Sequence, residues 1–126
     1  MPGPASRTDL AAELARRGFE HAHSAYQALR ARDKTFTLPE SELNDWGYGL
    51  AAAGQPQQAV QIFRLATLVY PDSANAFDSL AEGYAQAGNK AEAIKNYRRS
   101  LELDPNNKNA QQRLGLLGAG HEVRAR

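Results

Sequence analysis

A 34-residue internal repeat constrains the fold of this chain more than any other feature of its sequence. When residues 40–73 are placed on residues 74–107, identical residues coincide along both copies: Gly49 with Gly83, Ala51 with Ala85, Ala53 with Ala87, Gly54 with Gly88, Ala59 with Ala93, Arg64 with Arg98 and Pro71 with Pro105. Self-similarity at a fixed period of this length is typical of proteins built from stacked supersecondary units. We therefore expect an array of repeated units rather than a single irregular core.

Each copy carries the boundary signals of two helices. Gly54 and Gly88 favour a helix end, because glycine adopts the left-handed backbone at little cost. Pro56 suits the first turn of the helix that follows, and Asn89 is a favourable N-cap. The segment Thr37-Leu38-Pro39-Glu40 predicts a capping box at the start of the first copy. These signals predict helices at about 40–53, 56–69, 74–87, 90–103 and 108–117.

Apolar residues at helical spacing also predict an N-terminal helix over residues 8–33, which Gly18 could divide. Its end is similar to the second helix of a preceding repeat, because Ala25 and Leu29 lie 34 residues before Ala59 and Phe63. This helix and the capping helix 108–117 are expected to cover the open ends of a two-unit array. We expect residues 8–117 to form a single domain between a disordered N-terminus, 1–7, and a flexible tail, 118–126.

The second copy resembles the tetratricopeptide repeat at nearly every signature position: Phe77-x2-Leu80-Ala81-x2-Tyr84-x8-Ala93-x3-Tyr97-x2-Ser100-x4-Pro105. The first copy resembles it more loosely, with Trp46 and Leu50 where a Leu and a Tyr are usual. The resemblance implies an all-α fold, a right-handed α–α superhelix of helix hairpins with units 40–73 and 74–107. It also implies a protein–protein interaction module, and not an enzyme, that binds a peptide or protein segment in its concave face.

In tetratricopeptide arrays the first helix of each hairpin lines the concave surface. That implies these partner-binding residues: Asn44, Tyr48, Asn75, Asp78, Glu82 and Gln112. Tyr48 is the anchor candidate, since exposed aromatic side chains often dominate binding, although its ring could instead pack on the N-terminal helix. Asp78 and Glu82 lie one helical turn apart, where we expect both to be solvated and to favour a partner with a basic segment.

A narrower resemblance covers residues 18–110. The stretches Ser41–Tyr48, Tyr70–Leu80 and Asn96–Pro105 are similar to a C-terminal helical tail of bacterial serine hydrolases of the β-lactamase-related or esterase type. The catalytic part is absent, because the chain has neither a Gly-x-Ser-x-Gly elbow nor a Ser-x-x-Lys motif. The alternative function is therefore a structural or self-association module, an accessory tail domain without catalysis of its own.

Composition and charge argue against several other functions. The net charge is +1 without a dense basic stripe, so no nucleic-acid partner is expected, and no apolar run suits a membrane span. The chain has no cysteine, and His21 and His23 point to different sides of a helix, so neither a metal nor a cofactor is expected. The absence of a signal peptide predicts a cytoplasmic location, or a periplasmic one if the chain is a fragment.

Two repeats leave apolar ends, so we expect a weak homodimer through an end helix.

Overall fold

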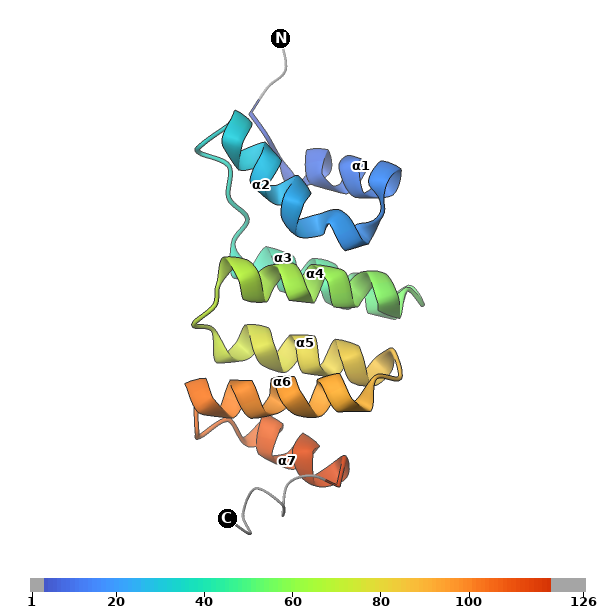
Figure 1. The fold of residues 1–126 in the computed structure, drawn as a ribbon, viewed down its shortest axis with the longest axis vertical. Helices are drawn as coiled ribbons and strands as arrows, with labels where there is room; N and C mark the ends of the chain where they lie inside the picture. Colours follow the sequence, from blue (N-terminus) through green and yellow to red (C-terminus); the bar gives the residue numbers. More distant parts are fainter. Residues whose placement is uncertain (1–3, 119–126) are drawn as a thin grey trace.

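The computed structural model describes residues 4–118, which form seven α-helices and one 3₁₀ turn and contain no strand. The elements are α1 (Arg7–Arg17), η1 (Phe19–His21), α2 (Ala22–Arg32), α3 (Glu40–Ala52), α4 (Pro56–Val69), α5 (Ala74–Gln86), α6 (Lys90–Leu103) and α7 (Lys108–Leu116). They stack in chain order along the long axis of the molecule (Figure 1). The all-α fold that the sequence predicts is confirmed.

The two sequence repeats fold as the helix hairpins α3–α4 and α5–α6, and their boundaries follow local chemistry. Gly54 and Gly88 follow the first helix of each hairpin with φ of 78° and 86°, in the left-handed region that favours glycine. Pro56 is the first residue of α4. The Glu92 amide donates to the Asn89 side chain at 3.2 Å, which caps α6. These sequence signals are confirmed.

The predicted capping box at Thr37–Glu40 is wrong. Pro39 is the N-cap residue of α3, and no side chain caps that end. The Thr37 hydroxyl lies 3.3 Å from the Tyr26 hydroxyl, and Glu40 accepts a hydrogen bond from Ser73 at 2.7 Å. Both polar side chains of the predicted box therefore take part in contacts with other elements instead of closing the helix end.

The segment predicted as one helix over 8–33 is two helices, α1 and α2, separated by Gly18 (φ 103°) and η1. This hairpin is tilted relative to the repeats (Figure 1). Its α2 and η1 pack against α4. The second helix of a regular preceding repeat would instead pack against α3, as α4 packs against α5. Thus α2 does not take the place of the second helix of a preceding repeat. The connection over 33–39 is longer than a hairpin turn, and it buries Phe36 and Leu38 in the core.

The chain before α1 is tied down close to its first helix. Ser6 caps α1 in a reciprocal capping box with Asp9, and the Ala5 amide donates to Asp33 at 3.0 Å. The disorder expected over 1–7 therefore does not hold for residues 5–7. Residues 1–3 and 119–126 lie outside the described residues, and the expectations for them remain predictions.

The largest apolar cluster joins the N-terminal hairpin to the first repeat. Leu14 of α1 and Tyr26 of α2 are buried in it together with Leu43 of α3 and Leu65 of α4. At the other end, Leu114 of α7 is buried in a cluster with Ala81, Ala93, Tyr97 and Ala110. The two flanking segments thus cover apolar surface of the repeats, as terminal caps do in repeat proteins.

Phe63 of α4 connects the two repeats. Its ring is buried and lies against Gly47 of α3 and Gly83 of α5. A Cβ added at either glycine would overlap the ring. The close approach of the three helices therefore requires the smallest residue at both positions.

Candidate binding site

Hydrogen bonds join successive first helices of the array across one face. We call α3, α5 and α7 the inner helices, and α4 and α6 the outer helices. The Tyr48 hydroxyl on α3 lies 3.0 Å from Glu82 Oε1 and 3.1 Å from Ser79 Oγ, both on α5. Since a carboxylate only accepts, the single phenol proton is donated to Glu82. The inner face therefore presents a tyrosine whose hydroxyl is already engaged by the next repeat.

The Tyr48 ring is held in place and still reachable. It is 36% exposed, and its centroid lies 4.8 Å from that of Phe63 in an edge-on arrangement. Burial raises the pKa of Tyr48 to about 12; the charges of Glu82 and Asp78 act in the same direction, and the hydrogen bond with Ser79 opposes them. The phenol stays protonated and hydrogen-bonded across the neutral pH range.

Asp78 is buried, with 9% of its surface exposed, so the expectation that it is solvated is wrong. Its Oδ1 accepts from Asn109 Nδ2 at 2.7 Å, and its Oδ2 accepts from Asn107 Nδ2 at 2.9 Å. Asn107 also caps α7, because its Oδ1 accepts from the Ala110 amide at 3.2 Å. The Asp78 carboxylate therefore fastens α7 to α5 and is not available to a partner.

The other predicted residues occupy different positions on the inner helices. Asn44 is half-buried, and its Oδ1 is a buried atom without a hydrogen-bond partner in the described part of the chain. The exposed Asn75 places its Nδ2 3.5 Å from Glu40. Gln112 is exposed on α7 and makes no hydrogen bond within residues 4–118. The structure thus joins Tyr48 and Glu82 by a direct hydrogen bond, and Gln112 makes no hydrogen bond to either of them.

Tyr97 and Asn107 belong to this region and were not predicted as site residues. Only 1% of Tyr97 is exposed. Burial raises its pKa to about 12; Asp78 and Glu82 reinforce that effect, and Arg113 of α7 opposes it. Within the described residues its phenol makes no hydrogen bond. The repeat could have indicated Asn107, because it lies 34 residues after Ser73, the cap of α5.

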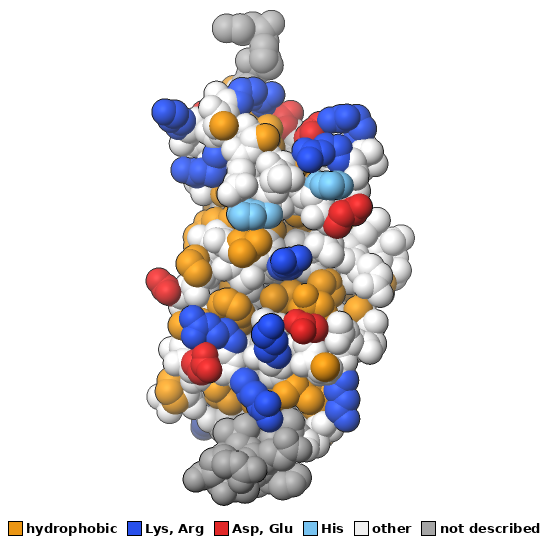
Figure 2. All heavy atoms as spheres, viewed as in Figure 1, with side chains coloured by type: hydrophobic (Ala, Val, Ile, Leu, Met, Phe, Trp, Pro, Cys, Tyr) orange, Lys and Arg blue, Asp and Glu red, His pale blue; other side chains and the backbone are white. Residues whose placement is uncertain are grey.

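Charge is divided between the two helices of each hairpin. The inner helices α3 and α5 carry five carboxylates and no Lys or Arg: Glu40, Glu42, Asp45, Asp78 and Glu82. The outer helices α4 and α6 carry five cations and two carboxylates: Arg64, Lys90, Lys95, Arg98, Arg99, Glu92 and Glu102. Figure 2 shows basic side chains spread along the side of the molecule that α4 and α6 present. The first helices of the two hairpins are therefore acidic, and the second helices are net basic.

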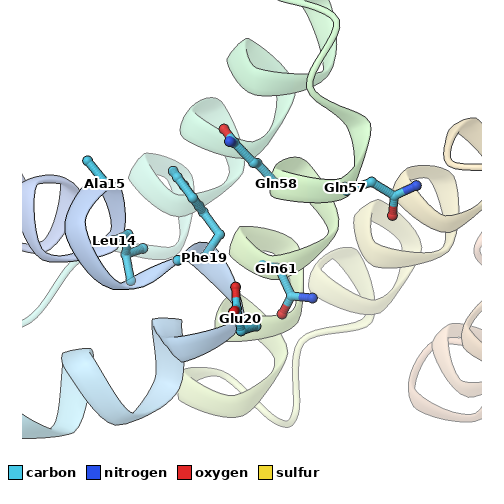
Figure 3. A pocket seen from close by; sticks show the side chains of 8 residues that line it. Leu14, Ala15, Phe19, Glu20, Gln57, Gln58 and Gln61 are labelled. Carbon is cyan, nitrogen blue, oxygen red and sulfur yellow. The ribbon is translucent and has the colours of Figure 1, made fainter.

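Grooves lie on the outer side. One of about 340 Å³ separates the N-terminal hairpin from α4, and its walls include Leu14, Phe19, Glu20 and Gln61 (Figure 3). Another of about 500 Å³ runs along α6 beside Phe77. Within residues 4–118 no His, Asp and Glu side chains gather in a group of three or more that could hold a metal ion. No helix in that range is long and apolar enough to cross a bilayer.

Comparisons with known proteins bear on the fold of the chain. Residues 74–107 match the tetratricopeptide repeat. The match coincides with the repeat unit that contains α5 and α6. A solved structure, the crystal structure of MamA, is similar at 21% sequence identity with a TM-score of 0.59. The similarity covers 89% of this chain and 66% of that one, so this chain spans just under two thirds of it.

The likeness to MamA confirms the helical-repeat fold. No curated protein matches the chain significantly. Neither the family match nor the similar structure bears on the resemblance to serine hydrolase tails, which remains a prediction.

Proposed function

We propose that this chain is a protein-interaction module that binds a peptide segment, carrying a lysine or arginine, in the concave face formed by α3 and α5. Tetratricopeptide repeats generally mediate protein–protein interaction, and one such repeat matches residues 74–107. The observation that carries the proposal is the Tyr48–Glu82 pair, which joins the two repeats at the surface.

This pair offers two complementary contacts to a cation. Glu82 Oε1 accepts from Tyr48, and its second carboxylate oxygen has no hydrogen bond within the described residues. That oxygen can accept a charge-assisted hydrogen bond from an ammonium or guanidinium group. The exposed part of the Tyr48 ring can hold the same cation by a cation–π contact. Because Phe63 and Glu82 already fix the ring, little side-chain entropy is lost on binding.

The acidic inner helices would guide such a segment to the pair. The five carboxylates of α3 and α5 face no Lys or Arg on those helices. Electrostatic complementarity of this kind raises association rates and orients a partner more than it raises affinity. Binding should therefore weaken as salt is added.

A partner is first recovered on the immobilised protein and identified by mass spectrometry. It is then titrated against four forms of the chain, the wild type and three variants. Tyr48→Ala should weaken binding about tenfold, as loss of an aromatic anchor does. Glu82→Lys should weaken binding and reduce its salt dependence. Asp72→Lys is the matched control, because it makes the same charge change in the turn between α4 and α5, where Asp72 is exposed and makes no hydrogen bond within residues 4–118. Equal affinity of all four proteins would exclude the inner face as the site.

Self-association is the second candidate, as expected for a structural or accessory tail module. Leu116 on α7 is 72% exposed, and no further helix packs on α7 within the described residues. An exposed apolar side chain at the end of an array can pair with a second copy. Light scattering over a range of concentrations should then show a dimer that Leu116→Gln disrupts. A monomer at every concentration would exclude this candidate.

A further inference from the structure

The groove along α6 lies on the outer side, away from the Tyr48–Glu82 pair. Its floor is apolar, with Phe77 of α5 and Ile94 of α6, both partly buried. Its walls carry Lys95, Arg99 and Glu102 from one face of α6. At about 500 Å³, the groove is large enough for several side chains of a partner.

The internal repeat shows what the same surface does in the first hairpin. Shifted back by 34 residues, Phe77, Lys95, Arg99 and Glu102 correspond to Leu43, Gln61, Leu65 and Leu68. The N-terminal hairpin covers the Leu43 and Leu65 part of that surface, because both are buried in one cluster with Leu14 and Tyr26, whereas Leu68 is 45% exposed. Figure 3 shows the seam, where Gln61 of α4 lies near Phe19 and Glu20 of the hairpin.

The first repeat therefore binds a pair of short helices on a surface that the second repeat leaves uncovered within residues 4–118. Equivalent surfaces of two repeats share their backbone geometry, so the second can receive a helix in the same way. The side chains differ in charge, because Lys95 stands where the first repeat has Gln61, and Arg99 where it has Leu65. The second repeat therefore presents cations at positions where the first repeat has an amide and an apolar side chain.

The charges define the partner. Arg99 lies over the Phe77 ring at 5.6 Å and pairs with Glu102 at 2.8 Å, while Lys95 makes no ion pair within the described residues. A ligand needs carboxylates for these cations and an apolar side chain for Phe77 and Ile94. Within residues 4–118, the acidic helices α3 and α5 are already packed in hairpins, so neither can lie on this groove.

We propose that the outer groove of the second repeat, between Phe77 and Lys95, docks an acidic amphipathic helix of another protein. The helix would lie on α6 as the N-terminal hairpin lies on α4. Its carboxylates would face Lys95 and Arg99, and its apolar residue would cover Phe77.

The test is a selection from a random library of 16-residue helix-forming peptides on the immobilised full chain. Enriched peptides should carry two or more carboxylates around a Leu, Ile or Phe. Fluorescence anisotropy of an enriched peptide should show about tenfold weaker binding to Lys95→Glu. Lys108→Glu is the matched control, because it makes the same charge change at an exposed position of α7, and it should bind within about twofold of wild type. Thermal unfolding of both variants checks that they fold.

Amide chemical shifts place the peptide. Shifts confined to residues 91–102 and Phe77 are expected, and shifts confined to α3 and α5 would overturn the proposal. The groove would be a solvated surface only if no peptide is enriched or if the enriched peptides are basic or neutral. Equal binding of an enriched peptide to wild type and Lys95→Glu would show the same. Concentration-dependent dimers that Lys95→Glu abolishes would identify a second copy as the occupant and also overturn it.

Discussion

At the scale of single residues, equivalent positions of the two repeats take different roles because their partners differ. Asp78 accepts hydrogen bonds from Asn107 and Asn109. The equivalent Asn44 has a buried oxygen without a partner in the described residues. The residues equivalent to Asn107 and Asn109 are Ser73 and Asn75, and both donate to Glu40. The second repeat has Ala74 at the position of Glu40.

Asp78→Ala should destabilise the protein by about 1–3 kcal/mol, because two amide donors would lose the acceptor that holds α7. Urea unfolding followed by far-ultraviolet circular dichroism measures the change. Asp45→Ala is the control, since Asp45 is exposed on α3 and should change stability by no more than about 0.5 kcal/mol. Equal effects of the two variants would contradict the structural role of Asp78.

Tyr48 should contribute to the loss of stability at high pH. Its pKa is raised from 10.0 to about 12, so the folded state binds the phenol proton more tightly than the unfolded chain. That contribution is fully present below pH 10 and is lost as the pH rises through about 12. The free energy of unfolding should therefore fall less steeply in Tyr48→Phe than in wild type over this interval. Parallel curves would contradict the shift.

At the scale of helices, two equivalent glycines have different surroundings because α2 does not pack against α3. Gly83 of α5 touches Phe63 of the preceding α4, whereas Gly49 of α3 has open space where a Cβ would stand. A regular preceding repeat would have placed its second helix against Gly49. The N-terminal hairpin packs on α4 instead, so this part of α3 is left uncovered.

Gly47→Ala should destabilise the protein by about 1–3 kcal/mol, because the new methyl group overlaps the buried Phe63 ring. Gly49→Ala, two residues further along α3, should stabilise it by about 0.5–1 kcal/mol, since alanine favours the helix and nothing obstructs it. Thermal and urea unfolding of the pair compare the same substitution in one helix. A stabilised Gly47→Ala would mean that α3 and α4 do not approach as described.

At the scale of the whole molecule, the N-terminal hairpin completes the core of the first repeat. It covers Leu43 and Leu65, which would otherwise form an exposed apolar surface on α3 and α4. The hairpin is therefore part of the folding unit, although the repeat pattern of the sequence does not include it.

A chain that lacks residues 1–36 should bind a hydrophobic dye, associate into oligomers and melt at a lower temperature than the full chain, because the largest apolar cluster loses one side. Dye fluorescence, light scattering and calorimetry measure these effects. A truncated chain that stays monomeric with an unchanged melting temperature would show that the hairpin is dispensable for the core.

The sequence predicts the repeating part of this fold and much less of the rest. Period and cap chemistry at Gly54, Gly88 and Asn89 act locally, so the hairpins could be predicted from the residues alone. The placement of the N-terminal hairpin depends on the buried Phe36 of an irregular connection, which follows no period. Burial of Asp78 depends on Asn107, which caps the following helix. The position of Asp78 within its own repeat does not indicate this partner.

Phe63 belongs to two repeats at once, because its ring lies against Gly47 of its own hairpin and Gly83 of the next. Unfolding either hairpin would therefore uncover this ring and remove packing from the other. In a linear array, such a shared side chain couples nearest neighbours and makes partly unfolded states costly. The two repeats should consequently melt in one transition, with a single denaturant midpoint and slowest amide exchange in the turns around Phe63.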